Sequence, residues 1–451
     1  MFSHPEQREV LDEIIVKMKS GRMTRRTFLE RAVAVGVSST AAVSLLEACG
    51  GGSGGSSGSG PATIIWQSEN DTSGAYQALV DNFNKSQKDV HLVWHNGPTS
   101  TDQLLTIYTN AFRARSSNID VISIDVVYPA EFGASGWTIK LDDKWSTSDR
   151  ANYLPGPIKS CTYNGNLWAV PFRTDAGVIY YRTDVIKTPP KTWAELVTMS
   201  KDNAGKGGTK YGYLWQGSQY EGLVCDFSEV LHGYGGDVLD PNNAKKVIVN
   251  SPEATQALTD MVSWVGTISP VNVTTLAEET DRSTWQNGES LFMRNWPYAY
   301  SHGNTPKESK IVGKFDITSM LYGGSGTVGH SAVGGWNLGI SSFSKNQDAA
   351  WKFVQYMLSA PAQKLIAVQA SLTPSLKSVY QDAEVQQKEP LFTKINQLQV
   401  LENSLPRPVS AVYPDLSNII QTHVHQALTK QVTPQAALSA MQSDLQALVS
   451  K

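Results

Sequence analysis

The chain has little cysteine and little net charge. Its three cysteines among 451 residues, Cys49, Cys161 and Cys225, form no C-x-x-C pair and no spacing typical of a zinc site. Cys161 and Cys225 can either pair outside the cell or remain two separate buried thiols. The net charge of -3 gives no reason to expect nucleic acid as a partner. A hydrophobic content of 40% with 18% charged residues describes soluble globular domains.

Signatures of catalysis and of cofactor binding are also missing. The chain has no G-x-S-x-G, no P-loop, no H-E-x-x-H and no dinucleotide-binding fingerprint. His423 and His425 lie two positions apart on an expected helix, so their side chains do not face the same way. The sequence therefore predicts no catalytic residue, no metal ligand and no cofactor.

The N-terminal apolar run, residues 32–46, is too short to span a bilayer comfortably, which favours a cleaved export signal over a transmembrane helix. Residues 24–29, TRRTFL, resemble the twin-arginine export motif. Residues 46–49, LEAC, resemble a bacterial lipobox. We expect residues 1–48 to be a twin-arginine lipoprotein signal peptide and Cys49 to carry lipid; the alternative is a plain signal with an incidental cysteine.

A segment of only Gly and Ser, residues 50–60, follows Cys49. Such a composition cannot bury a core, so residues 49–61 are expected to be a flexible tether. A tether behind a lipidated cysteine would keep the following domain at the outer face of the cell membrane. Because one acyl chain binds a membrane only marginally, stable anchoring would need several chains.

Strands and helices alternate from residue 63 onward. Hydrophobic periodicity predicts strands at 63–66, 90–94 and 120–127, with helices around 76–83 and at 101–115. This order implies a parallel sheet with right-handed crossovers, in which ligands bind beyond the carboxyl ends of the strands. Asp125 lies near such an end, and so does the polar loop 67–74.

The rest of the chain continues the mixture of strands and helices. Strands at 168–171 and 177–181 are expected to flank residues 172–175, where we place a crossover to a second lobe. Further strands are predicted at 211–216, 290–294 and 333–340, and further helices at 192–200, 222–231, 251–264, 348–358, 361–370, 416–428 and 434–449.

Aromatic residues gather around a proline near residue 296. Pro297 lacks a backbone donor and disfavours helical geometry before it, so Trp296 lies at a bend. Trp296 and Tyr298 offer flat apolar faces with polar tips, which suit a sugar ring, although rings of this size more often belong to the core. Arg294 can brace the bend without touching a ligand.

Charged residues near turns are the other candidates for a binding site. Asp125 and Asp175 can accept hydrogen bonds from sugar hydroxyls, or can form caps and ion pairs. Arg407, fixed between two prolines, can donate through its planar fork or form an interlobe salt bridge. Glu278 and Glu279 precede a helix, where carboxylates also complement the helix dipole.

Seven segments, taken in order, resemble one family. They are IDVV at 124–127, ASGW at 134–137, DAG with YYR within 175–182, WQGSQYEGLV at 215–224, RNWPY at 294–298, GGW at 334–336 and PRP at 406–408. These segments are similar to those of the extracellular solute-binding proteins of carbohydrate ABC importers (family 1), specifically the trehalose/maltose-binding group. The resemblance extends from Thr63 to Val449.

The resemblance implies a two-lobed α/β fold of the periplasmic-binding-protein type (type II). A sugar would lie in a cleft between lobes that are joined by hinge crossovers. The first lobe is expected to contain residues 62–174 with a return segment at about 315–360, and the second lobe residues 175–314 with C-terminal helices at about 361–451.

The resemblance also implies the residues of the cleft. Trp296 and Trp336 would stack on pyranose faces, with Tyr298 alongside. Polar contacts would come from Asp125, Asp175, Glu278, the Gly335 backbone, Arg407, Arg173 and Glu69. The last two depart from the family pattern, because Arg173 stands where tyrosine is frequent and loop 69–73 does not align cleanly. The choice between Glu278 and Glu279 stays open.

The expected function is that of a binding protein without enzymatic activity. A monomeric, extracytoplasmic lipoprotein, anchored through Cys49 to the bacterial membrane, would capture a di- or oligosaccharide of the trehalose/maltose type and deliver it to the permease subunits of an ABC importer. One alternative is a secreted glycoside hydrolase with Asp125 and Asp175 as acid and base. Another is a sugar-sensing lobe that reports to a membrane kinase or chemoreceptor.

Overall fold

The computed structural model describes residue 27 and residues 60–241 and 243–450. The chain divides into two compact units, 1–60 and 61–451, and the fold described below is that of the second unit. The lipobox cysteine, the expected signal peptide except Thr27, and the expected tether up to residue 59 lie outside the described residues. In the part of the chain that is described, every helix is too short or too polar to cross a membrane.

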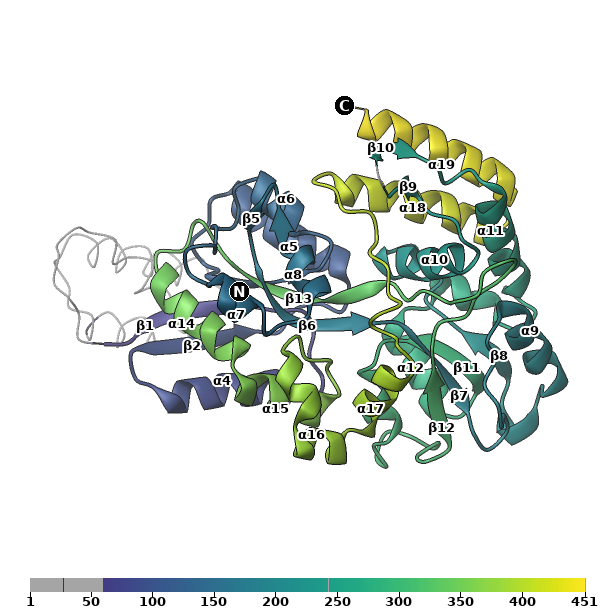
Figure 1. Ribbon diagram of the computed structural model, residues 1–451, viewed down its shortest axis with the longest axis horizontal. Coiled ribbons are helices and arrows are strands. Elements are labelled where there is room, and N and C mark those ends of the chain that lie inside the picture. Colours follow the sequence, from purple (N-terminus) through teal and green to yellow (C-terminus); the bar gives the residue numbers. More distant parts are fainter. Residues whose placement is uncertain (1–26, 28–59, 242, 451) are drawn as a thin grey trace. The chain divides into compact units, whose positions relative to one another are not determined.

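A five-stranded sheet forms the first half of the fold, in the order β2-β1-β3-β13-β6. Its strands are β1 (Ala62–Gln67), β2 (Val90–His95), β3 (Val121–Asp125), β6 (Val170–Ala176) and β13 (Val333–Ile340). β1 pairs in parallel with β2 and β3, as predicted, whereas β13 runs antiparallel to both β3 and β6. The sheet is therefore mixed. Its antiparallel strand, β13, comes from the C-terminal half of the chain, far from the other four strands in sequence (Figure 1).

Four helices lie on or next to this sheet: α4 (Ala75–Ser86), α5 (Thr101–Arg113), α14 (Gln347–Leu358) and α15 (Ala360–Ala370). The apolar stripe expected around residues 76–83 is the buried side of α4. The Ser100 hydroxyl caps α5 by accepting a hydrogen bond from the Gln103 backbone nitrogen. α15 packs against α4, and α14 packs against β1, β6 and β13.

Strand β6 runs through the segment where the sequence predicted an interruption. Arg173 and Asp175 lie inside β6, and β7 begins at Val178 in the other sheet. The expected end of the first strand at residue 171, with a break at 172–175, is therefore wrong, because β6 continues to Ala176. Charged residues fit this buried strand because Arg173 and Asp175 pair with each other, which offsets the cost of removing each charge from water.

A four-stranded sheet forms the second half, in the order β12-β7-β11-β8. Its strands are β7 (Val178–Arg182), β8 (Tyr211–Leu214), β11 (Ser290–Asn295) and β12 (Phe315–Thr318). β7 lies antiparallel to both β11 and β12, and β11 lies parallel to β8. The expected strands at 177–181, 211–216 and 290–294 are thus confirmed, to within two residues at each end.

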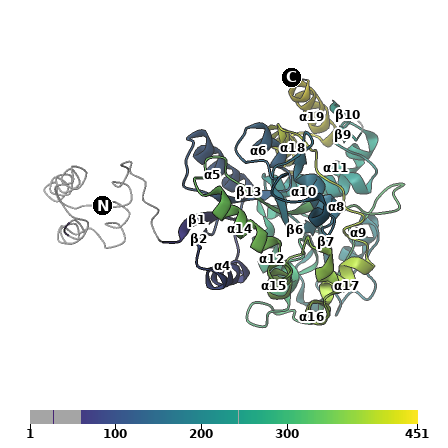
Figure 2. The ribbon, with the colours of Figure 1, turned by 60° about the vertical axis from the view of Figure 1, so that its left-hand side comes forward.

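The larger helices around this second sheet are α9 (Trp193–Asp202), α10 (Glu221–Gly233), α11 (Pro252–Trp264), α12 (Glu278–Gln286), α18 (Tyr413–Leu428) and α19 (Pro434–Val449). Thr192 and Glu195 form a capping box at α9, and Ser251 caps α11 ahead of Pro252. Every residue of α10 is buried, and α18 and α19 pack beside α10 and α11 (Figure 1, Figure 2).

Short elements complete the chain. They are α6 (Pro129–Ala134), α7 (Thr147–Arg150), α8 (Pro155–Ser160), β4 (Thr162–Tyr163), β5 (Asn166–Leu167), η1 (Lys206–Gly208), β9 (Leu239–Asp240), β10 (Asn243–Val247), η2 (Val271–Thr275), α13 (Ala299–Gly303), η3 (Lys377–Gln381), α16 (Ala383–Lys388) and α17 (Pro390–Gln397).

Cys161 and Cys225 are both buried free thiols, so the alternative of a disulfide between them is wrong.

The strand pairing places one segment in a different sheet from the one that the expected lobe boundaries imply. β12 falls within the expected return segment of about 315–360, yet it pairs with β7 in the second sheet. The first element to return to the first sheet is β13, and α15 follows it onto α4. We therefore propose that the first lobe includes β13, α14 and α15, and that the second lobe includes β12, α18 and α19.

Candidate functional site

A cavity of about 490 Å³ is lined by residues of the first sheet and by residues of the segments around the second sheet, such as Trp296 directly after β11. Its lining includes every residue that the sequence assigned to ligand binding: Glu69, Asp125, Arg173, Asp175, Glu278, Trp296, Tyr298, Gly335, Trp336 and Arg407. Pockets of this size accommodate small molecules. The structure thus brings these residues together, and their contact with a ligand remains a prediction.

Three of the lining residues share a row of the first sheet. Trp336 on β13 lies opposite Asp125 on β3 and opposite Arg173 on β6. Residues directly opposite one another in a sheet direct their side chains to the same face. The antiparallel insertion of β13 therefore sets an indole between an acidic and a basic side chain.

Two glycines before Trp336 allow close approach of other groups. Gly334 lies opposite Asp175, and a Cβ atom at Gly334 would lie only 2.7 Å from Cζ3 of Trp296. Gly335 has a φ of 116°, and its Cβ would lie 2.4 Å from the Arg173 carbonyl oxygen. A side chain at either position would displace its neighbours, so the Gly-Gly-Trp segment lets Trp296 lie against β13.

Trp296 lies directly after β11 and is half-buried. Its backbone nitrogen donates to Oδ1 of Asn295 at 2.8 Å, which fixes the expected bend. The guanidinium carbon of Arg294 lies 4.0 Å from the Trp296 ring centroid. Arg294 is fully buried, and its Nη2 donates to Oε1 of Glu229 at 2.6 Å. Arg294 therefore braces the bend from inside the protein, while Trp296 lines the cavity.

Glu278 and Glu279 both line the cavity from the first turn of α12. Glu278 accepts hydrogen bonds from the Tyr220 hydroxyl and, at 3.5 Å, from Nε1 of Trp296. Glu279 accepts one from the Tyr298 hydroxyl at 2.6 Å. Both carboxylates therefore orient aromatic side chains, in addition to complementing the helix dipole.

Arg407 joins the two halves of the fold. Its Nη2 donates to Oδ1 of Asp125 at 3.0 Å, and its Nη1 donates to Oε1 of Glu221 at the start of α10. Glu221 also accepts from the Tyr413 and Ser417 hydroxyls. Burial raises the pKa of the Glu221 carboxyl to about 7, although the Arg407 charge opposes this shift. Arg407 thus forms salt bridges with carboxylates of β3 and α10, and it also lines the cavity.

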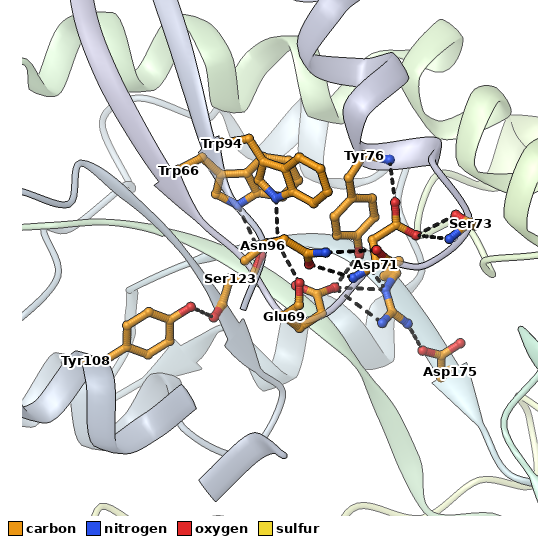
Figure 3. A network of polar contacts seen from close by, with 12 residues as sticks. Trp66, Glu69, Asp71, Ser73, Tyr76, Trp94, Asn96, Tyr108, Ser123 and Asp175 are labelled. Carbon is orange, nitrogen blue, oxygen red and sulfur yellow. Dashed lines mark hydrogen bonds and ion pairs between the residues drawn. The ribbon is translucent and has the colours of Figure 1, made fainter. Parts of the chain in front are cut away.

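Glu69, Arg173 and Asp175 form a second charged cluster in the lining. Arg173 pairs with Asp175 and, with Nη2 to Oε1 at 3.3 Å, with Glu69. Figure 3 shows Glu69 and Asp175 in this network, with Tyr76 next to Glu69. The two positions that departed from the family pattern therefore contact each other.

Several residues of the lining were not predicted from the sequence. Glu221 and Tyr220 belong to the WQGSQYEGLV segment used for the family resemblance, which was a usable signal, yet no role was assigned to them. Tyr76 was assigned to the apolar stripe of α4, which is correct for its ring but omits its hydroxyl. Residues 99–101 and His302 gave no signal in the sequence.

The two histidines of α18 have separate partners. His423 contacts Asp444 at 2.8 Å, and His425 contacts the Thr274 carbonyl oxygen at 3.0 Å. Across the described residues, no group of three or more His, Cys, Asp or Glu side chains is placed to hold a metal ion.

Comparison with known proteins identifies the family. The family model for bacterial extracellular solute-binding proteins matches residues 66–364. The chain belongs to this family. A relative from Deinococcus radiodurans, named a probable ABC transporter-binding protein, is 38% identical over 361 residues, which cover 77% of this chain and 84% of the relative. The maltotriose-binding protein of Pyrococcus abyssi is 22% identical over 319 residues, covering 65% and 68% of the two chains.

Solved structures agree with this assignment. Maltose-bound MalE3 of T. maritima has 37% sequence identity and a TM-score of 0.80, over 86% of this chain and 100% of its own. The GacH receptor of Streptomyces glaucescens, with 24% identity and a TM-score of 0.76 over 87% and 99% of the two chains, shares the fold. The family resemblance and the two-lobed α/β fold predicted from the sequence are confirmed.

Proposed function

We propose that this solute-binding protein captures a neutral di- or oligosaccharide, of the maltose or trehalose type, and delivers it to an ABC importer. The observation that carries the proposal is the composition of the cavity. Trp296, Tyr298 and Trp336 supply ring faces, and paired carboxylates and arginines supply hydrogen-bonding groups around them. Aromatic faces with a few convergent polar groups suit the apolar faces and hydroxyls of a sugar.

The relatives support both parts of this proposal. MalE3, the solved structure with 37% identity, holds maltose, and the Deinococcus relative is named for an ABC transporter. Capture would involve closure of the two halves of the fold around the sugar. Closed and open forms would then present different surfaces to the permease subunits.

Binding without turnover is consistent with the ion pairs formed by Asp125 and Asp175. Asp125 is paired with Arg407 and Asp175 with Arg173, so each carboxylate already has an ion-pair partner on the protein. A glycoside hydrolase would need one carboxyl to act as a proton donor. Incubation with maltose and trehalose should therefore release no glucose. Glucose release that disappears in Asp175→Asn would establish the hydrolase instead.

The proposed location is the outer face of the cell membrane, with a lipid on Cys49 and the Gly/Ser segment behind it as a tether. The family description, extracellular solute-binding protein, agrees with export. We further propose that the protein acts as a monomer. A role in sugar sensing would use the same cavity; permease genes beside the gene would favour import.

A thermal-shift screen tests the proposed function. The panel would contain maltose, trehalose, maltotriose, glucose, mannitol and a non-sugar control such as glutamate. A sugar that binds the native state alone raises the melting temperature by mass action. We expect maltose or trehalose to give the largest rise. A flat response to every sugar would contradict the proposal.

A further inference from the structure

The guanidinium of Arg173 contacts three side chains, one on its own strand and two from other segments. Its Nη1 donates to Oδ2 of Asp175 on the same strand. Its Nη2 donates to Oε1 of Glu69 at 3.3 Å, and its Nε lies 3.2 Å from the Tyr76 hydroxyl on α4. Arg173 is 8% exposed, and these contacts engage all three nitrogens of its guanidinium group.

Each carboxylate held by Arg173 keeps one oxygen without a partner. Oε2 of Glu69 and Oδ1 of Asp175 are buried and have no hydrogen-bond partner among the described residues. Both residues are 5% exposed, and both line the cavity. A buried acceptor without a donor is costly, so a hydroxyl delivered to this position gains both the hydrogen bond and the relief of that cost.

The loop that carries Glu69 is fixed on several sides (Figure 3). The Ser68 hydroxyl accepts a hydrogen bond from Nε1 of Trp94 at 2.8 Å. Asp71 accepts from the backbone nitrogen of Tyr76 at 3.0 Å, and its own backbone nitrogen donates to Oδ1 of Asn96 at 2.9 Å. Glu69 therefore keeps its position relative to β6 through contacts on both sides of it.

The charge of Arg173 favours the ionised forms of two adjacent carboxyl groups, Glu69 and Asp175. Burial raises the pKa of the Asp175 carboxyl to about 6, the Arg173 charge lowers it, and the Glu69 charge raises it. Burial also raises the pKa of Glu69, which Arg173 again opposes. The ionisable groups that interact with Asp175 are Arg173 on β6, Glu69 after β1, Asp125 on β3, Tyr180 on β7 and Tyr380 in η3. Arg173 is the cation among them.

We propose that Arg173 is a positioning residue for ligand binding, which holds Glu69 and Asp175 as a pair so that their remaining oxygens accept hydrogen bonds from two hydroxyls of one sugar unit. The inference rests on the proposed function. It assigns to Arg173 an effect that passes through the two carboxylates. Specificity for a sugar with two suitably spaced hydroxyls would follow from the fixed separation of Glu69 and Asp175.

The pH dependence of sugar affinity separates this role from a merely structural one. The probe is the sugar with the largest effect in the thermal-shift panel, titrated calorimetrically from about pH 5 to about pH 9. The wild-type affinity should fall as the pH drops through about 6, the pKa of Asp175, because a protonated carboxyl is a weaker acceptor. At about pH 7, Arg173→Met should bind about tenfold or more weakly, because a hydrogen bond to a charged group contributes at least this much.

The pH at which half of the affinity change has occurred, the midpoint, distinguishes the proposed role of Arg173 from a structural one. Loss of the cation raises the pKa of Asp175, so the midpoint in Arg173→Met should move to higher pH, and the affinity should recover as the pH rises. Adding Glu69→Gln removes the neighbouring anion, so the midpoint of the double variant should move back towards the wild-type value. Arg173→Lys keeps the charge and should keep the wild-type midpoint.

Several outcomes would overturn the inference. A uniform loss of affinity in Arg173→Met, with an unmoved midpoint, would assign Arg173 to structure alone, and an unchanged affinity would remove it from binding. If Arg173→Met fails to fold, Glu69→Gln alone should lower the midpoint, and an unmoved midpoint there contradicts the proposal. If no sugar of the panel binds the wild type, the proposed function fails and the inference fails with it; if a sugar binds, failure is confined to Arg173.

Discussion

The guanidinium carbon of Arg294 lies 4.0 Å from the ring centroid of Trp296. Arg294 is fully buried, with Glu229 as its ion-pair partner, whereas Trp296 is half-buried and lines the cavity. A cation over an aromatic face is attracted by the ring quadrupole, and the attraction grows when both groups are removed from water. The Arg294 guanidinium, which is fixed by its ion pair with Glu229, therefore holds the Trp296 ring in place.

Replacing Trp296 by alanine should weaken sugar affinity by about tenfold or more, because the stacking face is lost. The free energy of unfolding of the ligand-free protein should fall by less than about 2 kcal/mol, since Trp296 is half-buried and loses mainly its cation–π contact. Calorimetric titration and urea unfolding measure the two effects. Trp168→Ala is the matched control: this indole is also half-buried but lies outside the cavity lining, so affinity should be unchanged. A drop of about 3–5 kcal/mol in Trp296→Ala, with unchanged affinity, would make Trp296 a core residue.

Breaking the Arg294 ion pair should destabilise the whole fold. Arg294→Met leaves Glu229 buried without its cation, and removal of one partner of a buried pair costs about 3–5 kcal/mol. Lys352→Met removes a partner from the exposed pair with Asp89, where the cost should stay below about 1 kcal/mol. Urea unfolding of the two variants compares them directly. Equal, small losses would contradict the bracing role of Arg294.

Glu389 should make stability depend on pH. Burial raises the pKa of its carboxyl to about 7, although the Ser371 hydroxyl, which donates to it at 2.8 Å, opposes the shift. The folded state then binds more protons than the unfolded state, so this residue's contribution to stability decreases as the pH rises from the ordinary value of 4.5 to about 7.

The variant Glu389→Gln removes this titration. Relative to the wild type, its free energy of unfolding should be higher at about pH 8 than at about pH 5. Glu384→Gln is the control, because hydrogen bonds from Lys364 and Lys388 lower the pKa of Glu384 and its loss should give no such gain. An identical pH profile for wild type and Glu389→Gln would show that the carboxyl is not perturbed by burial.

Lipidation of Cys49 can be tested by fractionation of cells. Cys49→Ser should move from the membrane fraction to the soluble extracytoplasmic fraction, because the acyl attachment site is lost. Cys161→Ser changes a buried free thiol and should stay with the membrane. Retention of Cys49→Ser in the membrane fraction would argue against the lipoprotein assignment.

Much of the fold could be predicted because local signals agree with it. Helices α9 and α11 begin within one residue of the starts that the sequence predicted, 192 and 251. The antiparallel position of β13 could not be predicted, since pairing between residues 333–340 and two distant strands leaves no local signal. The continuity of β6 was missed because Arg173 and Asp175 look like loop residues until their mutual pairing is known.

Site residues could be predicted where they belong to a short segment typical of the family. Short segments such as GGW and PRP led to Trp336 and Arg407, and both line the cavity. The partners of those residues were not predictable, because they depend on which distant segments meet. Glu221, which holds Arg407 from α10, and Gly334, which makes room for Trp296, show their roles only in three dimensions.

Calorimetric titration of the wild-type protein with maltose and trehalose tests the central claim most directly. We expect saturable binding of at least one of the two sugars at a single site, with the sugar recovered intact afterwards. The absence of measurable heat with both sugars, confirmed by unchanged melting temperatures across the panel, or the appearance of glucose, would contradict the assignment of this cavity as a sugar-binding site.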